Sequence, residues 1–185
     1  MGKIILVTGG ARSGKSSFAE QLALKIGGGR AAYIATAQIF DDEMNFRVKL
    51  HRERRGDVWT TFEAPTAAHE KISVAAENFG AILFDCVTLY ISNFICAANL
   101  DDEKILYDEL RGLIQKLIDA AKNSDATVIF VTNEVGAGIV PENKLARHFR
   151  DLAGLANQML AAQSNKVFLT VAGLAVDIKK ISEVI

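Results

Sequence analysis

Eight residues near the start of the chain match a phosphate-binding motif at every fixed position. The motif is Gly-x-x-x-x-Gly-Lys-Ser/Thr, and the chain reads Gly9-Gly10-Ala11-Arg12-Ser13-Gly14-Lys15-Ser16. Glycines let the backbone wrap closely around phosphate oxygens, so that successive N–H groups form an anion-binding nest. A chance match somewhere in such a chain is on the order of one in a hundred. The motif therefore predicts nucleotide binding, with Lys15 on the β- and γ-phosphates and Ser16 on Mg²⁺.

The residues around the motif provide the strand and the helix that it requires. Residues 3–8 form an apolar run rich in β-branched residues, and two glycines follow it. This pattern is typical of a buried strand. After the motif, Phe18, Leu22 and Ile26 recur every four residues, and three glycines follow. This spacing predicts a helix over residues 15–26.

Strand and helix patterns alternate along the rest of the chain. Further strands are predicted at residues 31–35, 59–63, 81–85, 127–132, 167–171 and 174–178, and further helices at 41–54, 67–78, 88–97, 102–122 and 142–162. Such alternation implies an α/β fold with a mainly parallel sheet and helices on both faces. The last two strands predict an antiparallel hairpin at the sheet edge, turning at Gly173. With 185 residues, we expect one domain, residues 1–185, with the P-loop nucleotide-binding fold.

Composition excludes several other classes of protein. The 21 Lys and Arg residues nearly balance the 22 Asp and Glu residues, which argues against a dedicated nucleic-acid binder. We find no secretory signal and no apolar run of about 18 residues, the length of a membrane span. Cys86 and Cys96 form no metal-ligand or disulfide pattern. We therefore expect a cytoplasmic protein without a membrane span, in which both cysteines are small buried residues.

An acidic residue at the end of another buried strand is the usual partner of a phosphate-binding loop. The apolar run of residues 81–84 ends at Asp85. On its own, this pattern also fits an exposed carboxylate at a strand end. Together with the motif, it predicts that Asp85 contacts Mg²⁺ directly or through water.

His51 differs from the other two histidines because of its neighbours. It has five basic residues within four positions on either side, and such cations lower the pKa of an imidazole and keep it neutral and nucleophilic. Spacing alone equally fits a solvated basic helix with an incidental histidine. His69 and His148 lie in ordinary helical patterns, and we expect both at the surface.

Five later segments are more distinctive than the motif. They are residues 33–38 (YIATAQ), 41–44 (DDEM), 131–136 (VTNEVG), 139–143 (IVPEN) and 147–151 (RHFRD). With residues 7–16, they extend over nearly the whole chain. In this set and order, the sequence resembles the family of bifunctional adenosylcobinamide kinase / adenosylcobinamide-phosphate guanylyltransferases.

The resemblance implies two reactions and the residues that perform them. A nucleoside triphosphate, ATP or GTP, would phosphorylate adenosylcobinamide, and GMP from GTP would then be attached to that phosphate through a guanylylated histidine. His51 matches the family's nucleophile, although Leu50 stands where many relatives have another histidine. Besides the phosphate loop, the implied nucleotide-binding residues are Ala35, Thr36, Ala37, Arg52, Glu53, Arg54, Arg55, Glu63 and Asp85. The family also implies a homotrimer.

Three other functions remain open from the residues alone. A simple P-loop kinase of small molecules would need Lys15 and Asp85 but not His51. A nucleotide-dependent switch would order its loops on binding, although an Asn-Lys-x-Asp guanine-reading motif is missing. A nucleic-acid-stimulated ATPase fits poorly with the net charge of −1.

Overall fold

Seven strands form one sheet in the computed structural model, which describes residues 2–38, 56–98 and 102–183. The strands are β1 (Lys3–Gly9), β2 (Ala31–Ala35), β3 (Trp59–Glu63), β4 (Ala81–Asp85), β5 (Thr127–Val131), β6 (Lys166–Val171) and β7 (Leu174–Asp177). Their order across the sheet is β3-β2-β4-β5-β1-β6-β7. All neighbours are parallel except β6 and β7, which form an antiparallel edge hairpin. The mainly parallel α/β sheet and its antiparallel edge are confirmed.

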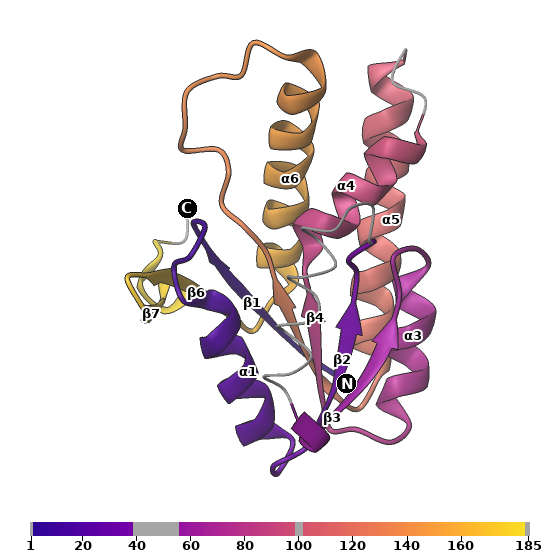
Figure 1. The fold of residues 1–185 in the computed structure, drawn as a ribbon, viewed down its shortest axis with the longest axis vertical. Coiled ribbons are helices and arrows are strands. Elements are labelled where there is room, and N and C mark those ends of the chain that lie inside the picture. The colour runs from indigo at the N-terminus through magenta and orange to yellow at the C-terminus, as the bar shows by residue number, and fades with distance from the viewer. Residues whose placement is uncertain (1, 39–55, 99–101, 184–185) are drawn as a thin grey trace.

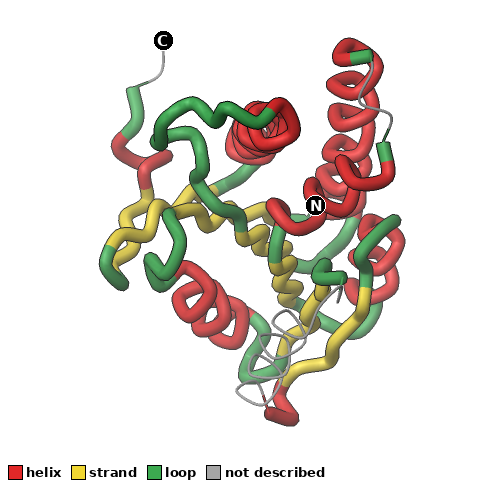
Figure 2. The backbone as a smooth tube through the Cα atoms, turned by 45° about the horizontal axis from the view of Figure 1, so that its top comes forward, coloured by secondary structure: helices red, strands yellow, loops and turns green. Residues whose placement is uncertain are grey.

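Helices cover both faces of this sheet (Figures 1 and 2). They are α1 (Lys15–Ile26), α3 (Ala68–Ala76), α4 (Val87–Ala97), α5 (Glu103–Asn123), α6 (Lys144–Gln163) and α7 (Ile178–Ile181), with a short 3-10 turn, η1 (Gly56–Val58). On one face, α1 packs against β4 and β5, and the opposite face carries α3, α4, α5 and α6. In the described part of the chain, no helix is long and apolar enough to cross a bilayer.

Alternation along the buried strands divides the core into two layers. In β1, Ile4 and Leu6 face the layer beneath α3 to α6, whereas Ile5 and Val7 face the layer beneath α1. Successive side chains of a strand point to opposite faces. Both faces of β1, β2, β4 and β5 are covered, so these strands are apolar along most of their length. This is why the carboxyl-terminal edge of the sheet is left for polar residues.

Some predicted boundaries shift because of local capping. The helix predicted over 142–162 begins at Lys144, since Asn143 caps it by accepting a hydrogen bond from the Ala146 amide at 3.1 Å. The helix α7 was not predicted. The helix predicted over residues 41–54 lies outside the described residues.

Two predictions about exposure were wrong. His148 is 6% exposed, because it lies on the face of α6 that packs against the core rather than on the solvent face. Its Nε2 atom lies 3.7 Å from Oε1 of Glu103. Cys96 is exposed near the end of α4, whereas Cys86 is buried as expected.

Candidate active site

The predicted site residues that the structure describes gather at the carboxyl ends of neighbouring parallel strands. Ala35, at the end of β2, is in register with Glu63 of β3 on one side and Asp85 of β4 on the other. The loop between β1 and α1 begins two strands away from β4, on the same edge (Figure 1). Open α/β sheets bind their ligands at this edge.

The phosphate-binding motif lies between a strand and a helix, as its chemistry requires. Gly9 ends β1 and Lys15 begins α1. Within the loop, Arg12 and Gly14 have positive φ values of 57° and 95°, and the Ser13 amide donates to the Gly10 carbonyl at 3.3 Å. Alternating backbone handedness of this kind turns amide groups inward as an anion-binding nest. The positive end of α1 adds to the same field.

The hairpin formed by β6 and β7 supports this loop from the far end of the sequence (Figure 1). The Ser13 and Thr170 hydroxyls lie 2.8 Å apart, and the Gly173 amide donates to the Ser13 carbonyl at 2.9 Å. A Cβ atom at Gly14 would lie 2.9 Å from the Cα atom of Gly173. Glycine is therefore needed at position 14 both for its backbone conformation and for this close approach.

Lys15 is a buried cation at the start of α1. The residue is only 9% exposed, and its Nζ atom donates a hydrogen bond to the Gly10 carbonyl at 3.0 Å. Burial lowers the pKa of Lys15 below its ordinary value, while the neighbouring Cys86 and Asp85 act in the opposite direction. Such a cation is poorly solvated by water, so phosphate oxygens in the loop would interact with it strongly.

Asp85 is held from both sides. The Tyr33 hydroxyl donates to Oδ2 of Asp85 at 2.9 Å. The next residue, Cys86, donates its amide proton to the Thr36 hydroxyl, which in turn donates to the Cys86 carbonyl, both at 2.8 Å. The carboxylate therefore has a defined position at the strand end, on the face where α1 begins.

The Thr36 side chain takes part in contacts within the fold. The residue is fully buried and its hydroxyl is used twice by Cys86. Its carbonyl accepts a hydrogen bond from the Asn93 amide at 2.8 Å, and Asn93 also donates to the Pro65 carbonyl at 3.0 Å. The Thr36 side chain thus joins the loops after β2 and β4, and Asn93 joins those after β2 and β3.

Glu63 lies across β2 from Asp85. The two residues occupy the same level on strands β3 and β4, so their Cα atoms are roughly 10 Å apart, two inter-strand spacings. Glu63 is exposed. His51 and Arg52, Glu53, Arg54 and Arg55 lie outside the described residues.

Several residues at this edge had no local signal in the sequence. Thr170 and Gly173 approach the loop only through the fold, and Asn93 looks like an ordinary polar residue of a helix. Tyr33 belongs to an apolar strand pattern, where its hydroxyl carries no recognisable signature. Only a prediction of strand register could have placed it beside Asp85.

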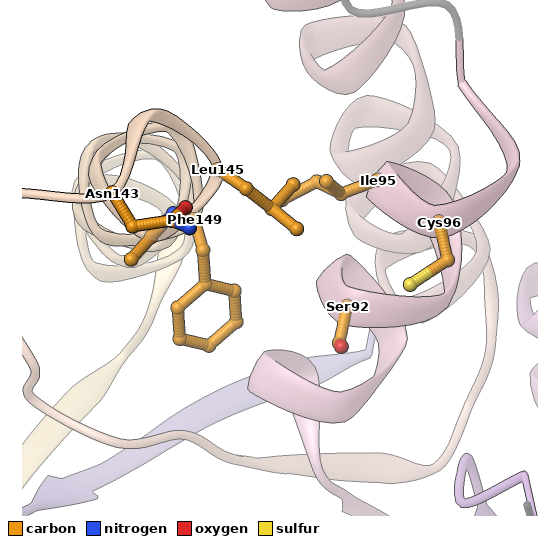
Figure 3. Close-up of a pocket in the computed structure, with 7 residues that line it drawn as sticks. Ser92, Ile95, Cys96, Asn143, Leu145 and Phe149 are labelled. Carbon is orange, nitrogen blue, oxygen red and sulfur yellow. The ribbon is translucent and has the colours of Figure 1, made fainter.

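A separate apolar pocket of about 270 Å³ opens between α4 and α6 (Figure 3). Phe149 and Leu145 of α6 face Ser92 and Cys96 of α4 across it. Its other lining residues are Ile95, Asn143 and Ala146. Of the predicted site residues that the structure describes, none lines this pocket.

Comparison with known proteins finds close relatives over nearly the whole chain. Residues 5–178 match the family described as cobinamide kinase / cobinamide phosphate guanyltransferase. The bifunctional adenosylcobalamin biosynthesis protein CobU of Escherichia coli is 45% identical over 183 residues, covering 95% of this chain and 99% of the relative. The protein of the same name from Salmonella typhimurium has the same identity and coverage. The bifunctional adenosylcobalamin biosynthesis protein CobP of Pseudomonas aeruginosa is 40% identical over 174 residues, covering 94% of this chain and 96% of the relative.

Proposed function

Because this chain belongs to the cobinamide kinase / cobinamide phosphate guanyltransferase family, a family of transferases, we propose that it performs two successive transfers on adenosylcobinamide. The first moves the γ-phosphoryl group of ATP or GTP to the aminopropanol hydroxyl. The second moves GMP from GTP to the new phosphate and gives adenosylcobinamide-GDP. One domain would carry both reactions in cobalamin biosynthesis.

The observation that carries the proposal is the phosphate loop between β1 and α1, with a buried Lys15, on the sheet edge where Asp85 ends β4. Phosphoryl transfer needs little covalent chemistry from a protein and depends on positioning and charge compensation. The loop amides and Lys15 supply donors and positive charge, and the fixed strand ends supply the positioning.

The oxygen ligands at this edge fit Mg²⁺. Ser16 lies in the first turn of α1, and Asp85 presents a partly exposed carboxylate held by Tyr33. Within the described residues, no cluster of three or more His, Cys, Asp or Glu side chains could hold a metal alone. Mg²⁺ commonly binds through one or two protein oxygens together with substrate phosphates, and when bound it neutralises phosphate charge. We propose Ser16 and Asp85 as its protein ligands.

In the guanylyl step, we propose His51 as the nucleophile. A neutral imidazole nitrogen attacks the α-phosphorus of GTP, the bond from that phosphorus to the bridging oxygen breaks, and pyrophosphate leaves. A phosphate oxygen of adenosylcobinamide phosphate then attacks the same phosphorus, and the phosphorus–nitrogen bond breaks to restore the histidine. We propose that the other implied residues contribute to nucleotide binding, namely Ala35, Thr36, Ala37, Arg52, Glu53, Arg54, Arg55 and Glu63.

Labelled GTP distinguishes this proposal from its alternatives. The protein is incubated with Mg²⁺ and GTP labelled in either the α- or the γ-phosphate, with and without adenosylcobinamide. Without adenosylcobinamide we expect the α label on the protein, and with it the α label passes to adenosylcobinamide-GDP. The γ label is expected on adenosylcobinamide. A small-molecule kinase would transfer only the γ label, and a switch protein would release phosphate without labelling protein or substrate.

Two further expectations belong to this proposal. The homotrimer implied by the resemblance predicts a sedimentation mass of about three chains at micromolar concentration. The cytoplasmic location also stays a prediction.

A further inference from the structure

The hydroxyl of Tyr33 reaches Asp85 from the neighbouring strand. Tyr33 pairs in register with Leu83 of β4, and Asp85 lies two residues further along the same face of that strand. The phenol oxygen donates to Oδ2 of Asp85 at 2.9 Å. A hydrogen bond to a charged acceptor is stronger and more directional than one between neutral groups, so this contact limits rotation of the carboxylate.

The ring that carries this hydroxyl is itself fixed. Tyr33 is 5% exposed and lies in the core layer beneath α1. Its ring meets that of Trp59 edge to face, with centroids 6.0 Å apart and an interplanar angle of 89°. A phenylalanine could make the same apolar contacts, so the hydroxyl is the group whose role needs an explanation.

The backbone beside Asp85 is fixed independently of Tyr33. Thr36 holds both the amide and the carbonyl of Cys86. With the main chain fastened in this way, the side-chain torsions of Asp85 are its remaining freedom. The Tyr33 hydroxyl restricts these torsions.

A fixed carboxylate also matters for Lys15. Asp85 acts on the pKa of Lys15, yet the ammonium donates to the Gly10 carbonyl inside the loop. A carboxylate free to rotate could approach the ammonium and compete with phosphate for it. The two groups thus have separate partners: the Lys15 ammonium bonds to the loop, and the Asp85 carboxylate bonds to Tyr33.

We propose that Tyr33 is a positioning residue that orients Asp85 toward the magnesium complex of the nucleotide. The inference rests on the proposed function, since it assumes that Asp85 acts on that complex. In this role Tyr33 would act through its hydrogen bond to Asp85 and not by contacting the metal or the substrate. Its removal should thus weaken the contribution of Mg²⁺ to nucleotide binding without changing metal-free binding.

The test is the variant Tyr33→Phe, measured by calorimetric binding of guanosine 5′-(α,β-methylene)triphosphate, whose α,β bond cannot be cleaved. Binding is measured on each protein with Mg²⁺ and with EDTA, and the ratio of the two affinities is the gain due to Mg²⁺. We expect this gain to fall about tenfold in Tyr33→Phe, as the loss of a hydrogen bond to a charged group predicts. Affinity in EDTA should stay unchanged.

Tyr90→Phe is the matched control. Tyr90 is also a buried phenol, and its oxygen accepts a hydrogen bond from the Ala68 amide at 3.2 Å on the opposite face of the sheet. The same chemical change there should leave the gain from Mg²⁺ at its wild-type value. Since each gain compares two measurements on one protein, a general loss of stability cancels.

A double-mutant cycle with Asp85→Asn isolates the coupling. If Tyr33 acts through Asp85, adding Tyr33→Phe to Asp85→Asn should not reduce the gain further. The inference would be overturned if the double variant lost the product of the two single losses in the gain from Mg²⁺. It would also be overturned if Tyr33→Phe kept the wild-type gain, and the hydroxyl would then be a structural group.

The cycle also separates this inference from the proposed function. An Asp85→Asn protein with a wild-type gain from Mg²⁺ would contradict the role proposed for Asp85, and the inference would fall with it. If Asp85→Asn reduces the gain from Mg²⁺ but Tyr33→Phe keeps the wild-type gain, only the role of Tyr33 is overturned.

Discussion

The hydroxyl of Thr36 donates a hydrogen bond to the Cys86 carbonyl and accepts one from the Cys86 amide, each at 2.8 Å. Just beyond the ends of β2 and β4, this side chain connects the two segments as backbone hydrogen bonds do within the sheet. The loop containing Ala37 and the residues that follow Asp85 are held as one unit.

Thr36→Val should therefore destabilise the protein strongly. Valine has nearly the same shape but no hydroxyl, so the buried amide and carbonyl of Cys86 lose their partner. We expect the free energy of unfolding to fall by about 2–4 kcal/mol, measured by urea denaturation. Thr36→Ser, which keeps the hydroxyl, should recover most of this loss. Equal stability of the valine and serine variants would contradict the structural role of the hydroxyl.

Lys15→Met should abolish both transfers while preserving stability. We expect each rate to fall roughly 10²- to 10³-fold, because the ammonium compensates phosphate charge in the transition state. The free energy of unfolding at pH 7 should not decrease, since a buried cation is replaced by an apolar chain of similar length. Rates are followed by product formation and stability by urea denaturation. Lys25→Met, an exposed change in the last turn of the same helix, is the control and should keep both activities.

The lowered pKa of Lys15 also predicts a pH dependence of stability. Burial disfavours the protonated form in the folded protein, so the folded state loses this proton at a lower pH than the unfolded state. Stability attributable to Lys15 should thus rise with pH between the folded pKa and the unfolded value of about 10.5. Lys15→Met should lack this rise, and the same rise in both proteins would contradict the explanation.

His51→Asn should remove the covalent adduct. With GTP and Mg²⁺, we expect the wild-type protein to gain the mass of GMP through a phosphorus–nitrogen bond that is lost in acid and survives in base. An asparagine amide cannot act as this nucleophile, so the variant should neither form the adduct nor transfer GMP. Phosphorylation of adenosylcobinamide should persist, because it requires no covalent intermediate on the enzyme. Mass spectrometry of the intact protein measures the adduct.

His69→Asn is the control for this experiment, and its adduct should be unchanged. His148 is a poor alternative nucleophile because it is buried in α6 beside Glu103. A base-stable GMP adduct on His51→Asn would nevertheless contradict the assignment and require the modified residue to be mapped.

The two cysteines should differ sharply in reactivity. Burial, reinforced by the charge of Asp85, raises the pKa of Cys86 to about 11, so its reactive thiolate is scarce at pH 8. Cys96 is exposed. Brief treatment of the folded protein with iodoacetamide should thus add one label, at Cys96, as read by peptide mass mapping. Cys96→Ser should take up no label until the protein is unfolded, and labelling of folded Cys96→Ser at Cys86 would contradict the prediction.

The sequence pattern predicts the ends of a helix or strand correctly where the residue type changes sharply at that point. The helix after the phosphate loop was predicted to end at Ile26, because three glycines follow it, and α1 does end there. The strand ending at Asp85 was also predicted with its observed bounds, since a carboxylate at that position stops an apolar run. Hydrophobic alternation and terminating residues such as glycine act over a few neighbouring residues, so they can be recognised directly in the sequence.

Burial on amphipathic helices was harder to predict. The spacing of Leu106, Leu110, Leu113 and Leu117 predicts that Leu113 lies on the buried stripe of α5. In the structure Ile114 is the fully buried residue, and Leu113 is partly exposed. His148 was misplaced for a similar reason, because the polar character of a residue outweighed its position on the helix. Which side of a helix is covered depends on the crossing angle with its neighbours, and this is a property of the fold.

The site could be predicted as a set of residues but not as an arrangement. Lys15 and Asp85 were expected to work together, and the structure brings them to the same edge. Tyr33 and Thr36 hold Asp85 and its neighbour Cys86 through contacts between segments about 50 residues apart along the chain. Such contacts leave no periodic signal in one sequence.

The contact of the phosphate loop with the β6–β7 hairpin has a consequence for synthesis of the protein. Ser13 and Gly14 belong to the first tenth of the chain, but their contacts, Thr170 and Gly173, are translated more than 150 residues later. A chain still on the ribosome can contain the entire motif and yet lack the β6–β7 hairpin that contacts the loop. Tight nucleotide binding should hence arise only after the last strands have been translated and have paired with β1.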